Sequence, residues 1–170
     1  MLIGVVSDTH GFYDPRVPPM LEGVEHILHA GDIGTGQILE QLGEIAPVTA
    51  VRGNNDKDGP ESEFPEVQMI DLGGCRIYLT HIVKVPKEGD DAGLDLYREQ
   101  KADAVVFGHS HYSFHELRDG LTFFNPGAAG KRRCSKSCRP SACWTWSRAE
   151  LKGGYWFCEA LLPPGAYSTG

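Results

Sequence analysis

Five short apolar runs recur along the first two thirds of the chain, and each leads directly into a polar residue or cluster. The runs cover residues 2–7, 26–30, 48–52, 76–80 and 104–107. Short runs of β-branched and apolar residues bounded by turn residues are typical of strands buried on both faces of a sheet. Residues 36–45 and 92–101 carry apolar side chains at helical spacing. Strands that alternate with helices predict βαβ units and a largely parallel sheet.

After about residue 112 the pattern changes to paired strands. Residues 113–117 and 121–124 flank an Asp-Gly turn, which is a strong hairpin signal. Residues 66–72 and 75–79 flank Gly73-Gly74 and predict another hairpin. A third strand pair is predicted at residues 142–147 and 155–161, around Gly153-Gly154. A mixed sheet or two stacked sheets within one α/β domain, spanning residues 1–170, would accommodate all of these strands.

Composition and charge narrow the function. The 170 residues include 16 Lys and Arg against 23 Asp and Glu, a net charge of −7 that argues against binding bulk DNA or RNA. No apolar run approaches the roughly 20 residues that span a bilayer. The first eight residues lack a basic segment and include an acidic residue, so no signal peptide is expected, and a cytoplasmic protein is predicted. The basic, cysteine-containing stretch 131–143 is interpreted as a solvated loop, with attraction of a phosphate-bearing substrate as the alternative.

Polar residues able to bind a metal follow each of the five apolar runs. In open α/β sheets, ligand sites lie outside the carboxyl ends of the strands, so these residues are expected to converge. The members of the pairs Asp8/His10 and His109/His111 are two positions apart, and in extended backbone each pair would face one side. The expected set is Asp8, His10, Asp32, Asn54, His81, His109 and His111.

Mixed nitrogen and oxygen ligands without thiolate favour manganese, iron, cobalt, nickel or zinc over magnesium. Two divalent ions need about this many protein ligands when a carboxylate bridges them. A single Asp or Asn after a strand is more often a turn residue or a helix cap, and a lone histidine is usually structural. The metal interpretation therefore rests on the presence of a residue able to bind metal at all five predicted strand ends. His29 lies close enough in sequence to Asp32 to act as an outer partner of a ligand.

The motifs Asp8-x-His10, Gly31-Asp32, Gly53-Asn54, His81 and Gly108-His109-x-His111 resemble, in order and spacing, the calcineurin-like metallophosphoesterase superfamily. The short chain is most similar to its small single-domain phosphodiesterases. The resemblance covers about residues 1–127, ending at Asn125-Pro126-Gly127, and fades over the divergent residues 128–170. It implies a four-layer sandwich of two stacked mixed β-sheets flanked by helices, with a dinuclear metal centre at one edge.

The resemblance also implies individual roles. Asp8, His10 and His111 would hold one ion, Asn54, His81 and His109 the other, and Asp32 would bridge them. The implied reaction is hydrolysis of phosphoesters, and of phosphodiesters in particular, by a metal-activated bridging hydroxide. Asn54 and Asn55 would contact the substrate. Manganese is the expected ion, and the expected partner is a small, nucleotide-like phosphoester; a homo-oligomer remains open.

Three positions depart from the family pattern. Asn55 stands where many relatives have a histidine that assists the leaving group, and a neutral amide cannot act as a general acid. A preference for good leaving groups and for diesters over alkyl monoesters is therefore expected. Ile82 and Val83 stand where relatives often continue Gly-His, so the wall beside the second ion is expected to differ.

The alternative function is a non-catalytic protein-binding scaffold, as in the similar sorting subunit of retromer; the complete ligand set favours an enzyme.

Overall fold

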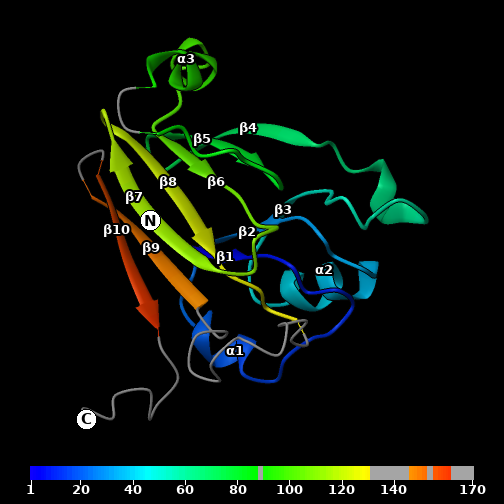
Figure 1. The fold of residues 1–170 in the computed structure, drawn as a ribbon. Helices are drawn as coiled ribbons and strands as arrows, with labels where there is room; N and C mark the ends of the chain where they lie inside the picture. Colours follow the sequence, from blue (N-terminus) through cyan, green and yellow to red (C-terminus); the bar gives the residue numbers. More distant parts are fainter. Residues whose placement is uncertain (88–89, 131–145, 153–154, 162–170) are drawn as a thin grey trace, which may run out of the picture.

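The computed structural model of the chain describes residues 1–87, 90–130, 146–152 and 155–161. Its helices and strands follow the predicted alternation closely (Figure 1). In chain order they are β1 (Leu2–Val6), α1 (Val17–Met20), β2 (His26–Ala30), α2 (Gly36–Gly43), β3 (Val48–Val51), the 3-10 helix η1 (Pro60–Glu63), β4 (Val67–Leu72), β5 (Cys75–Thr80), α3 (Asp91–Glu99), β6 (Ala104–Val106), β7 (Ser113–Arg118), β8 (Leu121–Pro126), β9 (Trp146–Lys152) and β10 (Tyr155–Leu161).

Within the described residues, the strands form two five-stranded mixed sheets. The first has the order β10-β9-β1-β2-β3, and the second has the order β4-β5-β6-β8-β7. Strands β1, β2 and β3 are parallel, as are β5, β6 and β8, whereas β9, β10, β4 and β7 pair antiparallel with their neighbours. The carboxyl ends of the parallel strands in each sheet therefore point the same way, which is the arrangement that gathers a site at one edge.

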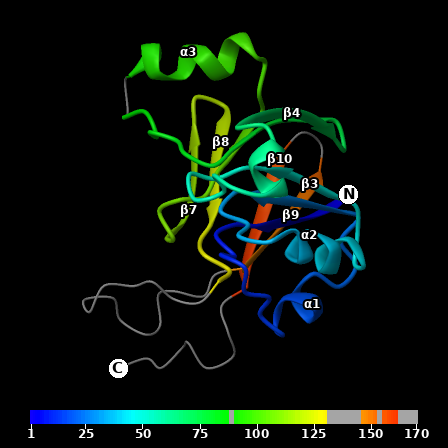
Figure 2. The same cartoon turned by 90° about the vertical axis from the view of Figure 1, so that its right-hand side faces the viewer.

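Three apolar clusters fill the spaces between the layers. One packs α1 and α2 against the first sheet, one fills the space between the sheets, and one packs α3 against the second sheet. Because side chains alternate along a strand, Ile27 of β2 faces the helices while its neighbour Leu28 faces the other sheet. Figure 2 shows α3 on the opposite side of the sheets from α1 and α2. This layering confirms the predicted four-layer sandwich.

The structure differs from the sequence prediction in the third strand pair. Its first strand is Trp146–Lys152 instead of residues 142–147, and it pairs antiparallel with β1, so the pair extends the first sheet. Residues 142–145 and the stretch 131–143 lie outside the described residues. The short helix α1 is additional to the two predicted helices; it contains two prolines, which a first helical turn tolerates. That one domain spans residues 1–170 stays a prediction. In the part of the chain that the structure describes, no helix combines the length and hydrophobicity required for a membrane crossing.

Candidate metal centre

The candidate ligands lie in loops that begin where the parallel strands end. Asp8 and His10 follow β1, Asp32 follows β2, and Asn54 follows β3. From the second sheet, His81 follows β5 directly, and His109 and His111 follow β6. Loops from both sheets thus supply side chains to one region.

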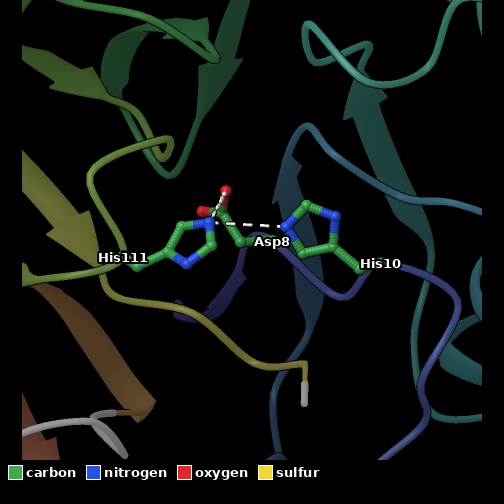
Figure 3. A group of neighbouring side chains, drawn as sticks. All are labelled: Asp8, His10 and His111. Carbon is green, nitrogen blue, oxygen red and sulfur yellow. Dashed lines mark hydrogen bonds and ion pairs between the residues drawn. The ribbon is translucent and has the colours of Figure 1, made fainter. Parts of the chain in front are cut away.

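The first group of converging side chains is Asp8, His10 and His111 (Figure 3). Their ligand atoms lie within 4.8 Å of one another, although His10 and His111 are 101 positions apart in the sequence. The Nε2 atom of His111 lies 3.2 Å from Asp8 Oδ1 and 3.4 Å from His10 Nε2. These are the three residues that the family resemblance assigned to one metal ion.

The second group is Asp8, Asp32 and His81, all of which are buried. The Nε2 atom of His81 lies 3.4 Å from Asp32 Oδ2 and 4.0 Å from Asp8 Oδ1. Asp32 Oδ2 also lies 3.7 Å from His10 Nε2, so this carboxylate is near histidines of both groups. The two groups share Asp8, while Asp32 lies between His10 and His81.

Two buried ligand atoms lack hydrogen bonds. Among the described residues, Asp8 Oδ1 and His81 Nε2 are buried side-chain atoms with no hydrogen-bond partner, although buried polar atoms are normally paired. Two atoms bound to one ion at about 2.1 Å, with an angle of about 90–109° between them, lie roughly 3.0–3.4 Å apart. The 3.2 Å and 3.4 Å separations at these atoms agree with that geometry. The donor set therefore fits a divalent metal ion.

Hydrogen bonds outside the cluster orient both atoms inward. Asp8 Oδ2 accepts from the Ser7 hydroxyl at 2.6 Å and from the His109 amide at 3.0 Å, which leaves Oδ1 facing the cluster. His81 Nδ1 lies 2.7 Å from the Ala30 carbonyl oxygen, to which it can only donate. Nδ1 therefore carries a proton, and Nε2 faces the site, as outer partners of metal-binding histidines arrange it.

The local backbone differs from the expectation. Asp8, His10, Asp32, His109 and His111 have φ values of 55°, 48°, 54°, 67° and 60°. The prediction that extended backbone aligns each i, i+2 pair was wrong, because these residues adopt the left-handed conformation. That conformation costs roughly 1–2 kcal/mol per non-glycine residue, and such strain is concentrated at functional sites. Backbone hydrogen bonds to the neighbouring loop hold it, from Asp8 N to Gly31 O at 3.0 Å and from His10 N to Asp32 O at 2.9 Å.

Asn55 and Asp56 have structural roles that the sequence did not reveal. Asn55 donates to both oxygens of Asp32, from its backbone nitrogen at 2.8 Å and from Nδ2 at 2.6 Å. The buried Asp56 carboxylate accepts from the backbone nitrogens of Ile33, Gly34 and Gly53 at 2.8–3.0 Å. It thereby connects the loop after β2 to the loop after β3. The sequence shows only a polar run here, which is equally typical of an ordinary turn.

His29 connects two ligand loops from beneath the site. Its Nδ1 accepts from the Gly31 amide at 3.2 Å, so its Nε2 carries the proton and donates to the Thr9 hydroxyl at 3.0 Å. That hydroxyl in turn donates to the Ile33 carbonyl at 2.9 Å. Burial lowers the pKa of His29 from 6.5 to about 4, which keeps the ring neutral at physiological pH. The predicted proximity of His29 to the ligands is thus indirect, through Thr9 and Gly31.

Asp32 is held in its ionised form. Burial raises its pKa, but the adjacent His81 and the two hydrogen bonds from Asn55 outweigh burial and keep the pKa of Asp32 well below its ordinary value. An ionised carboxylate is the form that binds a metal ion.

Asn54 and His109 lie at the rim of the cluster. Both are exposed, and the His109 ring lies edge-on to the His81 ring with centroids 5.3 Å apart. Asn54 and His81 line a common pocket. The structure therefore places these two predicted ligands around the outer side of His81, whereas the other five predicted ligands form the tight cluster.

The fold and the site define a two-sheet α/β sandwich with a candidate metal centre at the strand ends. The family model of the calcineurin-like phosphoesterase superfamily domain matches residues 1–144, and the chain belongs to that family. A probable metallophosphoesterase of Methanothermobacter thermautotrophicus is 36% identical over 75% of this chain and 77% of its own. A probable metallophosphoesterase of Methanocaldococcus jannaschii is 33% identical over 79% of this chain and 71% of its own.

Solved structures confirm the fold. Vps29 from Entamoeba histolytica, determined in complex with zinc, superposes with a TM-score of 0.70 at 23% identity, over 95% of this chain and 99% of that one. The family resemblance and the sandwich predicted from the sequence are thus both confirmed.

Proposed function

We propose that the protein hydrolyses phosphodiesters at this cluster with two divalent cations, manganese being the favoured ion. The observation that carries the proposal is the pair of buried ligand atoms, Asp8 Oδ1 and His81 Nε2, that face the cluster without hydrogen bonds. The family supports the class of reaction, because its relatives are named as metallophosphoesterases.

The residues divide into two ligand sets around a shared carboxylate. Asp8, His10 and His111 would hold one ion, and His81, Asn54 and His109 the other, with Asp32 between them. When bound, a pair of divalent cations neutralises phosphate charge and lowers the pKa of bound water. The protein's own contribution is positioning: Asn55 fixes both oxygens of Asp32, and Ser7 and the His109 amide fix Asp8.

The leaving group determines the preferred substrate. The side-chain amide of Asn55 donates a hydrogen bond to Asp32, and a neutral amide is too weak an acid to protonate a departing alkoxide. Good leaving groups and activated diesters are therefore favoured over alkyl monoesters. Comparable turnover of an alkyl phosphate and an aryl diester would contradict this preference.

The first prediction tests activity with matched variants. The full chain is stripped of metal, reloaded with manganese and assayed on bis-para-nitrophenyl phosphate, with metal content measured separately. We expect metal-dependent hydrolysis and two ions per chain. Asp32→Asn should reduce kcat/KM by more than about 100-fold, beyond the roughly 10- to 100-fold effect typical of outer partners of a metal ligand.

The control is Asp95→Asn, which makes the same change on the exposed side of α3 and should leave activity intact. Two bound ions without hydrolysis would overturn the proposal and favour the protein-binding scaffold. Undiminished activity of Asp32→Asn would contradict the role of this carboxylate.

A further inference from the structure

A pocket of about 360 Å³ opens directly beside the cluster. Three segments build it: the loop after β3, the start of β4, and the end of β5. His81 and Asn54, which line it, are also candidate ligands of one metal ion. A phosphoester bound at the cluster therefore has one ester substituent within reach of this pocket.

The pocket wall includes large apolar side chains that remain exposed. Ile82 is 54% exposed and Val67 is 40% exposed, and both line the pocket together with Tyr78. Ile82 follows His81 in the chain, so the residue that departs from the family pattern forms part of this wall. Exposed apolar side chains gathered at a concave site are typical of a surface that receives a ligand.

The charged groups of the pocket are already paired. Arg52 Nη2 donates to Glu66 Oε1 at 2.7 Å, and Arg52 Nη1 donates to the Ser62 carbonyl at 3.4 Å. The Glu66 carboxylate thus offsets the guanidinium charge, and it would repel an anionic group placed beside it. The lining consequently favours an uncharged substituent over a second phosphate or a carboxylate.

We propose that this pocket binds the uncharged, ring-bearing ester substituent of a phosphodiester, an aryl or nucleoside group, with Ile82 and Val67 as its apolar contacts. This inference rests on the proposed phosphodiesterase function. A volume of about 360 Å³ lies within the roughly 300–1,000 Å³ range of small-molecule pockets. A methyl substituent would leave most of that volume unfilled. Diesters with an aryl substituent in the pocket should therefore be hydrolysed with a higher kcat/KM than diesters with a methyl substituent there.

The test compares two diesters that release the same leaving group. Bis-para-nitrophenyl phosphate and methyl para-nitrophenyl phosphate differ only in the substituent that remains, and each rate is divided by its uncatalysed rate. We expect the normalised kcat/KM of the manganese-loaded full chain to favour the diaryl substrate by about tenfold. Ile82→Ser should lower the diaryl value several-fold more than the methyl value. Leu117→Ser, an equally polar change at a 62% exposed residue of β7, should change neither value.

A binding measurement separates this inference from the proposed function. Diphenyl phosphate and dimethyl phosphate are titrated into metal-free full chain while the methyl resonances of Ile82 and Val67 are followed by NMR. Chemical-shift changes of these methyl groups with diphenyl phosphate but not with dimethyl phosphate would support binding in the pocket, even if no hydrolysis is detected. An unchanged substrate ratio in Ile82→Ser, together with unmoved methyl resonances, would overturn the inference while leaving any observed hydrolysis intact. A stronger response to bis(4-carboxyphenyl) phosphate, whose ester substituents are themselves negatively charged, would overturn it as well.

Discussion

His29 shows how a residue outside the ligand set can determine the geometry of the site. Its Nδ1 accepts a hydrogen bond from the Gly31 amide, and its Nε2 donates one to the Thr9 hydroxyl, so each nitrogen has one defined role. Residues of the loop after β1 and of the loop after β2 are thereby fixed relative to each other through a neutral side chain. A protonated ring could no longer accept from Gly31, because both nitrogens would be donors.

The pKa of His29 predicts a pH dependence of stability. Its pKa is 6.5 in an ordinary environment and about 4 in the folded chain. As the pH falls through this window, the unfolded chain binds a proton that the folded chain does not, so the free energy of unfolding decreases, by about 3 kcal/mol in all. Urea unfolding at several pH values should show this loss in the natural chain.

The variant His29→Gln should lose that component and unfold with a shallower pH dependence. His26→Gln, on the same strand but half-buried and bonded to Thr49, should remove a smaller component. Identical pH slopes for the natural chain and His29→Gln would contradict the assignment.

At the scale of the elements, loops that follow neighbouring strands hold one another in place. The Asp56 carboxylate accepts hydrogen bonds from three backbone amides in the loops after β2 and β3. The loops after β1 and β6 approach so closely that a Cβ at Gly108 would lie 1.8 Å from Ser7 Oγ. The ligand positions therefore depend on contacts between loops as much as on the strands that carry them.

Asp56→Ala should release those three amides. We expect a loss of about 2–4 kcal/mol in the free energy of unfolding, because buried donors left without partners cost about 1–3 kcal/mol each and the loops can partly resolvate. Metal affinity should fall as well, since Ile33 and Gly53 flank Asp32 and Asn54. Urea unfolding and metal titration measure the two effects. Asp58→Ala, at an exposed aspartate two residues further on, should change neither quantity.

Across the whole molecule, the site joins the two sheets. Loops of the first sheet supply Asp8 and Asp32, and loops of the second sheet supply His81 and His111. A metal ion bound by side chains from both sheets links them in the folded state, and the unfolded chain has no such preformed site.

Metal should therefore raise the unfolding temperature. Manganese at 100 times its dissociation constant adds about 2.7 kcal/mol, which corresponds to about 5–10 °C for a chain of this size. Calorimetry with manganese and with a chelator should show the difference. The variant His81→Gln should lose most of it, whereas His115→Gln, at an exposed histidine of β7, should retain it. Equal unfolding temperatures in both conditions would contradict a metal link between the sheets.

The sequence by itself determined the strands, their order along the chain and the polar residues at their ends. These features are local: apolar runs indicate buried strands, and Gly73-Gly74 and Asp119-Gly120 indicate the turns between paired strands. From parallel strands alone it followed that the polar residues meet at one edge. The ordered motifs also identified the family before any contact was known.

Only the tertiary structure decided how the side chains meet. His10 and His111 are 101 positions apart, and their 3.4 Å separation depends on how two sheets stack. The left-handed backbone at Asp8 and His109, the bonds of Asn55 to Asp32, and the paired charges of Arg52 and Glu66 all arise between loops of different strands. Local sequence cannot specify such contacts, because each is stabilised by partners that the chain brings close only after the strands have paired or the sheets have stacked.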